Sequence, residues 1–178
     1  MKTEKLEDIV RKLLLLVDLK HPLVVGIDGV NGSGKSTLAV NISKEITGRI
    51  INVDDYVEKN KGEYLSRVAY QTLQKAVNQF VSASEPIIII EGVCLLNVLE
   101  KIKIQPDILV YIKRIGSYGF WIDDKLCDSE IPLEDALQFI SRAETVHGVG
   151  NLDREIAVYH RNYSPLEKAD FIFERVEA

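Results

Sequence analysis

The chain has 178 residues, of which 46% are hydrophobic and 28% are charged, and its formal net charge is -5. This composition is ordinary for one globular domain with a hydrophobic core. An acidic chain is a poor general binder of nucleic acid or anionic membranes, and no apolar run approaches the roughly 18 residues of a membrane span. We therefore expect a small-molecule substrate, with neither nucleic acid nor a membrane as partner, and we make no prediction of oligomeric state.

The two cysteines, Cys94 and Cys127, stand alone in the sequence and lack the spacing of metal ligands. We expect both to be buried, reduced thiols, which is typical of cytoplasmic proteins. Residues 1–20 mix acidic with basic side chains and contain no cleavage site of small residues, so they do not read as a secretory signal. The sequence thus favours a cytoplasmic protein.

Hydrophobic periodicity predicts the first elements along the chain. Residues 4–19 form an expected amphipathic helix, and residues 23–27 form a short apolar strand. A helix is expected over residues 35–46, ending before Gly48, and a second strand over residues 50–53. Apolar residues between Leu65 and Phe80 then recur at helical spacing, which predicts a long helix.

The remaining elements indicate a parallel sheet. Residues 87–90 are four isoleucines without a polar face, a pattern typical of a strand buried on both sides, and residues 107–112 repeat it. Two helices follow, one around residues 133–140 and one from Asn151 to the region of Pro165, before a last strand over residues 169–173. Strands that alternate with helices predict one three-layer α/β domain with a mostly parallel sheet over residues 1–178.

The stretch GIDGVNGSGKST, residues 26–37, meets the pattern G-x-x-x-x-G-K-[ST] between a predicted strand and a predicted helix. Glycines let successive backbone N–H groups point at phosphate oxygens, and the following helix adds its positive end. Lys35 is expected to reach the β- and γ-phosphates, and Ser36 to ligate Mg²⁺. The predicted nucleotide-binding residues are Gly29, Asn31, Gly32, Ser33, Gly34, Lys35, Ser36 and Thr37.

Acidic residues follow two of the predicted strands. Asp54 and Asp55 come after the second strand, and Glu91 comes directly after the four isoleucines. Because the carboxyl ends of strands line the ligand crevice of an open α/β sheet, we expect these carboxylates to gather near the glycine loop. There they can hold Mg²⁺ or accept the proton of an attacking hydroxyl. Ser36, Asp54 and Glu91 are the predicted metal-site residues.

Three segments, GIDGVNGSGKST, VDDY and IIIIEGVCLL, together resemble the uridine kinase and phosphoribulokinase group of P-loop kinases. The segment HRNYSPLEKADFIFE is similar to the family's Tyr-x-Pro segment before its last strand. The resemblance implies a five-stranded parallel sheet with a helical lid, and ATP and Mg²⁺ as ligands. By position, Asp54 matches the family's catalytic Asp, which activates the acceptor hydroxyl, and Glu91 matches its acidic residue near Mg²⁺. ATP rather than GTP rests on this resemblance alone.

The chain departs from the family pattern at two places. Tyr56 stands where Phe is expected, and Val57 follows it. After the fourth strand, Arg114 leads into an aromatic segment where uridine kinases usually carry an arginine-rich lid. The lid and helical region is expected over about residues 114–163.

Arginines that close over a transferring phosphoryl group lower the barrier, because negative charge spreads over its oxygens. The candidates are Arg114, Arg142, Arg154 and Arg161, and we choose Arg142 and Arg154 as catalytic candidates beside Lys35 and Asp54. Arg175, near the last strand, is a weaker candidate for the adenine pocket.

Aromatic residues suggest where an acceptor could bind. Tyr56 and Tyr64 follow Asp54 closely, so we place them with Asp54 and Asp55 in the acceptor pocket. Tyr118, Phe120 and Trp121 either stack on a base or cover hydrophobic surface. We expect Asp123 and Asp124 to be solvated, and His21, His147 and His160 to be ordinary surface or capping residues, although His160 could contact phosphate.

The function predicted from the sequence is phosphoryl transfer from ATP to a hydroxyl of a small molecule, with a nucleoside such as uridine or cytidine preferred by resemblance. Other acceptors stay open: pantothenate, a sugar phosphate or a nucleoside monophosphate. A degenerate ATP-binding regulatory module is also open. A GTP switch is disfavoured, because the sequence contains no N-K-x-D element for reading guanine.

Overall fold

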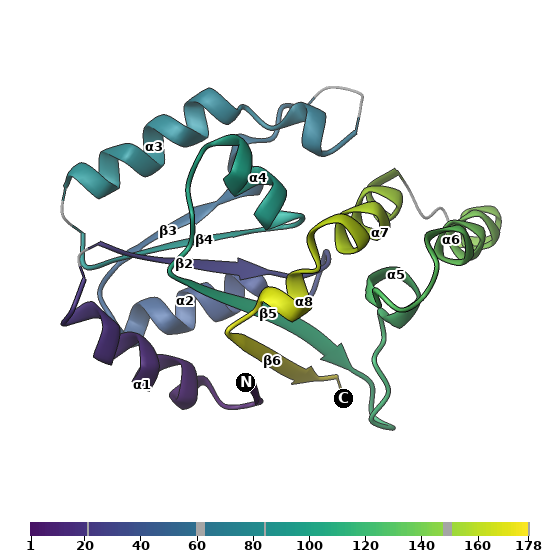
Figure 1. Ribbon diagram of the computed structural model, residues 1–178, viewed down its shortest axis with the longest axis horizontal. Coiled ribbons are helices and arrows are strands. Elements are labelled where there is room, and N and C mark those ends of the chain that lie inside the picture. The colour runs from purple at the N-terminus through teal and green to yellow at the C-terminus, as the bar shows by residue number, and fades with distance from the viewer. Residues whose placement is uncertain (21, 60–62, 84, 148–150, 178) are drawn as a thin grey trace.

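The computed structural model describes residues 1–20, 22–59, 63–83, 85–147 and 151–177. A central parallel sheet has helices on both faces, and α5 and α6 lie beyond the carboxyl end of β5 (Figure 1). The strands are β1 (Lys2–Thr3), β2 (Leu23–Asp28), β3 (Arg49–Asn52), β4 (Ile87–Gly92), β5 (Ile108–Ile115) and β6 (Phe171–Val176). Their order is β1-β6-β5-β2-β4-β3, and every pairing is parallel. The three-layer α/β prediction is confirmed.

Helices connect the strands. They are α1 (Leu6–Val17), α2 (Lys35–Glu45), α3 (Tyr70–Ser82), α4 (Leu95–Lys101), α5 (Asp124–Cys127), α6 (Leu133–His147), α7 (Asn151–Tyr163) and α8 (Pro165–Lys168). Two short 3-10 turns, Val53–Tyr56 and Leu65–Arg67, follow β3 and precede α3. None of the described helices is long and apolar enough to cross a membrane.

Each face of the sheet has its own hydrophobic core, as the four consecutive isoleucines of β4 illustrate. Successive side chains of a strand point to opposite faces. Ile87 and Ile89 pack into the core beneath α1 and α2, whereas Ile88 and Ile90 pack into the core beneath α3 and α4. A strand with both faces covered needs apolar residues throughout, which explains why this segment lacks alternation.

Over the residues that the structure describes, the sheet has six strands rather than the predicted five. The additional strand, β1, is only two residues long and pairs with β6, Lys2 opposite Ile172 and Thr3 opposite Phe173. A strand of two residues is too short to show alternation of apolar and polar side chains, so the sequence did not predict it. The following helix begins at Leu6.

The helix predicted from Leu65 begins only at Tyr70. Val68 instead forms an isolated antiparallel bridge with Val57, and the N–H of Ala69 donates to the carbonyl of Tyr56 at 2.8 Å. This backbone pairing holds residues 65–69 against residues 56–58, directly beside the acidic turn that follows β3.

Candidate active site

The glycine-rich loop lies between β2 and α2, as predicted. Gly29 has φ +152°, and a Cβ there would lie 2.7 Å from the Ser33 hydroxyl and 3.1 Å from the Ile112 carbonyl oxygen. Gly34 caps α2 in the left-handed region, with φ 98°. Both positions therefore require glycine, the first by close approach and the second by backbone conformation. The loop closes tightly at the amino end of α2, the geometry of an anion-binding site.

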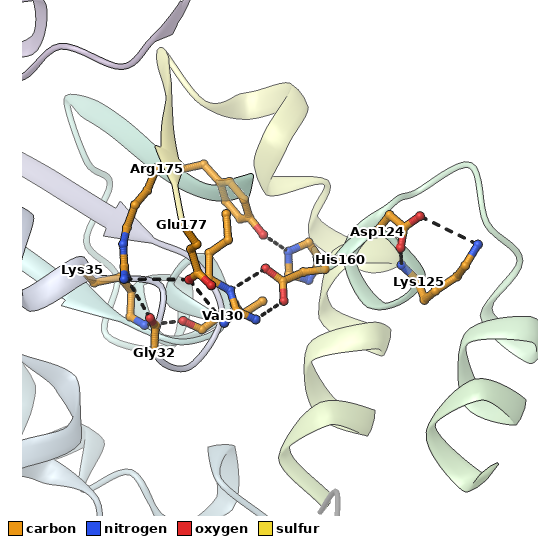
Figure 2. A network of polar contacts seen from close by, with 11 residues as sticks. Val30, Gly32, Lys35, Asp124, Lys125, His160, Arg175 and Glu177 are labelled. Atoms are coloured by element: carbon orange, nitrogen blue, oxygen red, sulfur yellow. Dashed lines mark hydrogen bonds and ion pairs between the residues drawn. The ribbon is translucent and has the colours of Figure 1, made fainter. Parts of the chain in front are cut away.

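Lys35 is 6% exposed, and its Nζ donates to the Val30 carbonyl at 2.8 Å (Figure 2). Burial lowers the pKa of Lys35, while the carboxylates of Glu91, Asp28 and Asp54 act in the opposite direction. The ammonium group is thus buried in the loop, donates to the Val30 carbonyl, and is stabilised in its charged form by three acidic side chains. A phosphate oxygen would offer it a stronger, charge-assisted partner.

Ser36 and Glu91 meet across the end of the sheet. The Ser36 hydroxyl donates to Glu91 Oε1 at 2.7 Å, and Glu91 is 2% exposed at the carboxyl end of β4. Burial raises the pKa of Glu91, and the charge of Asp54 raises it further. A hydroxyl beside buried carboxylate oxygens is a donor set that Mg²⁺ prefers.

The described residues contain no group of three or more His, Cys, Asp or Glu side chains arranged to hold a metal ion. Mg²⁺ in phosphoryl-transfer sites is usually held by one or two carboxylates together with substrate phosphates. The pair of Ser36 and Glu91, with the charge of Asp54 near it, fits that kind of site and not an all-protein cage.

Asp54 lies on the 3-10 turn after β3, where its N–H donates to the Asn52 side chain at 2.9 Å. The Tyr64 hydroxyl donates to Asp54 Oδ1 at 2.7 Å. Burial and this carboxylate raise the pKa of Tyr64, so its hydroxyl keeps its proton and acts as a donor. The expected pair of Asp54 and Tyr64 is thus brought together, whereas Asp55 is exposed and Tyr56 packs against the α3 side core.

Asp28 is a site residue that the sequence analysis did not single out. It is 1% exposed at the end of β2 and accepts from the Gly29 N–H at 2.7 Å and from the Tyr159 hydroxyl. Burial raises its pKa from 3.8 to about 6, although these hydrogen bonds and the charge of Lys35 act in the opposite direction. The one acidic residue in an otherwise apolar strand was the available signal.

A chain of polar contacts runs from the loop to the start of α5 (Figure 2). Arg175 donates to the Gly32 carbonyl at 3.1 Å and lies 3.8 Å from Glu177. Glu177 lies 3.8 Å from Arg114, which forms a bidentate pair with Asp123. Arg175 also lines a cavity of about 280 Å³ with Thr37, Asn41 and Phe173, on the α2 side of the loop.

One sequence prediction is wrong at this chain of contacts. Asp123 was expected to be solvated, but it is 5% exposed because the Arg114 guanidinium pairs with its carboxylate. The same pairing occupies Arg114, a lid candidate. Asp124 is partly exposed and lies 3.8 Å from Lys125.

The other lid candidates have different surroundings. Arg154, on α7, lines a cavity of about 450 Å³ between α4, α7 and residues 63–66, and donates to the Ser141 hydroxyl at 3.2 Å. Arg142 lies on exposed α6 surface, in a depression lined by residues of its own helix. Arg161 donates to the carbonyls of Leu126 and Ile131, so its role is to join α7 to the α5–α6 connection.

His160 is buried, against the expectation of a surface or capping residue. It bonds the Tyr111 hydroxyl at 2.8 Å and the Ile156 carbonyl at 2.8 Å. Burial lowers its pKa from 6.5 to about 4, so it is neutral near pH 7 and structural. His21 and the His147 side chain lie outside the described parts.

Both cysteines are free and buried, as predicted. In the aromatic segment, Tyr118 is 91% exposed and Phe120 is also exposed, while the Lys113 ammonium lies 4.3 Å from the Trp121 ring centroid. Only Trp121 covers hydrophobic surface, on the α3 side core.

Comparison with known proteins gives fold neighbours. No protein-family model matches this chain, and a search of curated proteins finds no match either. Among solved structures, a possible uridine kinase from Bacillus stearothermophilus has 17% sequence identity and a TM-score of 0.52, with 93% of this chain and 99% of that chain covered. A protein assigned as a fructose transport system kinase from Silicibacter sp. has 15% identity and a TM-score of 0.51, covering 96% of this chain and 99% of that chain.

These similarities establish the fold: this chain shares the three-layer α/β architecture of these two structures over nearly its whole length. At such low identity the likeness extends to the arrangement of elements and not to the substrate.

Proposed function

We propose that this chain is an ATP- and Mg²⁺-dependent kinase that transfers a phosphoryl group to a hydroxyl of a small molecule, and that a nucleoside is the first acceptor to test. The observation that carries the proposal is the convergence of Lys35, Ser36, Glu91 and Asp54 at one end of the sheet. Nucleotide binding alone requires the loop and the metal-site carboxylate Glu91. The additional carboxylate, Asp54, is what a hydroxyl acceptor would need.

Each residue has a role in the proposed transfer. Lys35 and the loop N–H groups bind the phosphates, and Ser36 with Glu91 would hold Mg²⁺, which neutralises charge on the phosphates. Asp54 orients the acceptor hydroxyl and accepts its proton as the oxygen attacks. The Tyr64 hydroxyl holds one oxygen of Asp54, which leaves the other oxygen for the acceptor.

The cavity of about 450 Å³ offers room for the acceptor. Its volume falls in the range of small-molecule sites, and it adjoins Tyr64 through the neighbouring residues Glu63 and Leu65. Asn97 and Asn162 supply amide groups that suit a hydroxylated ligand, and Arg154 supplies a cation for a phosphoryl group. A nucleoside fits this mixture of groups, as does another small polyol.

We also place the protein in the cytoplasm. Cys94 and Cys127 are both free and buried, which fits a reducing compartment.

The proposal is tested by incubating the purified protein with Mg-ATP and a panel of nucleosides, pantothenate, sugar phosphates and nucleoside monophosphates. Mass spectrometry should detect a product heavier by one phosphoryl group. Asp54→Asn should retain Mg-ATP affinity and lose at least about 100-fold in turnover, while Asp18→Asn, an exposed change at the end of α1, serves as the matched control.

A phosphorylated uridine or cytidine would support the nucleoside assignment. A product from another acceptor would keep the mechanism and change the substrate. Intact ATP, bound without any product over the whole panel, would refute the kinase and favour a regulatory nucleotide-binding module.

A further inference from the structure

Helix α7 carries two polar side chains, Glu155 and Tyr159, that contact different parts of the candidate site. They are one helical turn apart, so they share one face of the helix. In Figure 1 this helix lies between α4 and α5, and it contacts both. The proposed mechanism assigns a role to neither residue.

Tyr159 contacts the strand that leads into the glycine loop. It is 2% exposed, its hydroxyl donates to the Asp28 carboxylate, and the same oxygen accepts from the Leu96 N–H at 3.1 Å. Asp28 also accepts from the N–H of Gly29, the first residue of the loop. One hydroxyl of α7 therefore fixes the point where the loop leaves the sheet.

Glu155 contacts the other half of the site. Its carboxylate accepts from the backbone N–H groups of Tyr64 and Leu65, the latter at 2.9 Å. Both oxygens are occupied, so the carboxylate fixes the backbone of these two residues. Tyr64 in turn donates its hydroxyl to Asp54. The position of the Asp54 carboxylate thus depends on α7 through Tyr64.

We propose that Glu155 and Tyr159 are positioning residues through which α7 aligns the two halves of the reaction: Tyr159 sets the phosphate loop through Asp28, and Glu155 sets Asp54 through Tyr64. This inference rests on the proposed phosphoryl transfer. Four residues along a helix span about 6 Å, and a helical turn is stiff, so neither contact can shift without the other. When α7 moves, the glycine-rich loop and the Asp54 carboxylate therefore move with it.

The two contacts predict opposite kinetic signatures. Tyr159→Phe should weaken Mg-ATP binding about tenfold, because Asp28 loses a hydrogen bond to its charged form, and should leave kcat within about threefold. Glu155→Ala should leave Mg-ATP affinity within about twofold and lower kcat at least about tenfold. Glu155→Gln keeps one oxygen acceptor and should recover part of that loss.

A second readout is independent of turnover. In Glu155→Ala the amide hydrogens of Tyr64 and Leu65, followed by NMR, should exchange with solvent at least about tenfold faster, because they lose their acceptor. In Tyr159→Phe their exchange should be unchanged. Glu7→Ala and Tyr118→Phe are the matched controls, each removing the same group from an exposed side chain.

A double variant tests the route through Tyr64. If Glu155 acts through it, the loss of kcat in Glu155→Ala with Tyr64→Phe should be much smaller than the product of the single losses. Additive losses, or a raised acceptor KM with unchanged kcat and amide exchange, would overturn the positioning role and make Glu155 an acceptor-binding residue.

Equal changes of nucleotide affinity and kcat in both variants would also overturn the proposal, since they would reduce α7 to a structural support. The outcomes are separable from the proposed function. If the unmodified protein transfers no phosphoryl group, the kinase assignment fails. Mg-ATP affinity in Tyr159→Phe and amide exchange in Glu155→Ala still report whether α7 holds the glycine-rich loop and the backbone of Tyr64 and Leu65.

Discussion

Asp28 offers the sharpest test of the electrostatics beneath the glycine loop. Its pKa rises from 3.8 to about 6 in the folded protein, chiefly because burial disfavours the charged form. The folded state therefore holds a proton more tightly than the unfolded state. The stability that this group contributes is fully present below pH 3.8 and is lost as the pH rises through about 6.

The magnitude follows from the size of the rise. At about 1.4 kcal/mol per pKa unit, a rise from 3.8 to about 6 corresponds to about 3 kcal/mol between the two plateaus. Asp28→Asn removes the titration and keeps an oxygen that accepts from the Gly29 N–H. The free energy of unfolding of the variant, minus that of the unmodified protein, should increase by about 2 kcal/mol between pH 4 and pH 7, because part of the titration lies below pH 4.

Urea denaturation, followed by circular dichroism at half-unit steps from pH 4 to pH 8, measures this difference directly. Subtraction removes the contribution of every other titrating group, including His160. A difference that stays constant with pH within about 0.5 kcal/mol would refute the reasoning, because it would mean that the buried carboxylate is solvated or fully compensated by its partners.

Three further predictions concern neighbouring residues. His160→Gln should flatten the acid side of the stability curve by up to about 3 kcal/mol between pH 6.5 and pH 4, because a depressed histidine pKa makes the unmodified protein lose stability as pH falls; urea denaturation measures it. Gly92→Ala places a Cβ 2.8 Å from Val53 Cβ and should cost about 1–3 kcal/mol, seen as a lower Tm. Lys35→Met should weaken Mg-ATP binding by about 10- to 100-fold in calorimetry without lowering Tm, since it removes a buried charge.

Local patterns predicted most of the fold and the donor half of the site. The isoleucines of β4 and the spacing from Gly29 to Ser36 are patterns within about ten residues. They predict a buried strand and a phosphate-binding loop without knowledge of any distant contact. The acidic residues at strand ends followed from one topological rule about parallel sheets. The convergence of Lys35, Ser36 and Glu91 at one end of the sheet agrees with that rule.

Contacts between distant segments could not be read in the same way. Tyr159 donates to Asp28, which lies 131 residues away in the sequence. Arg114 pairs with Asp123 across a turn, and hydrophobic periodicity does not predict the geometry of that turn. His160 was expected at the surface, and its burial could not be read from its own segment because its partner Tyr111 belongs to β5. Polar residues in cores are specified by their partners, and those partners become visible only in three dimensions.

The pairing of β1 with β6 bears on how the protein is made. Lys2 lies opposite Ile172, so the first strand leaves the ribosome 170 residues before its neighbour exists. At about 5–20 residues per second, this interval lasts roughly 10–30 s. During that time α1 can dock on the early sheet, but the slot between β1 and β5 stays open, with unpaired backbone groups along β5. Nascent chains are therefore most exposed to edge-to-edge association, and to chaperones that recognise open strands, in the interval before β6 inserts.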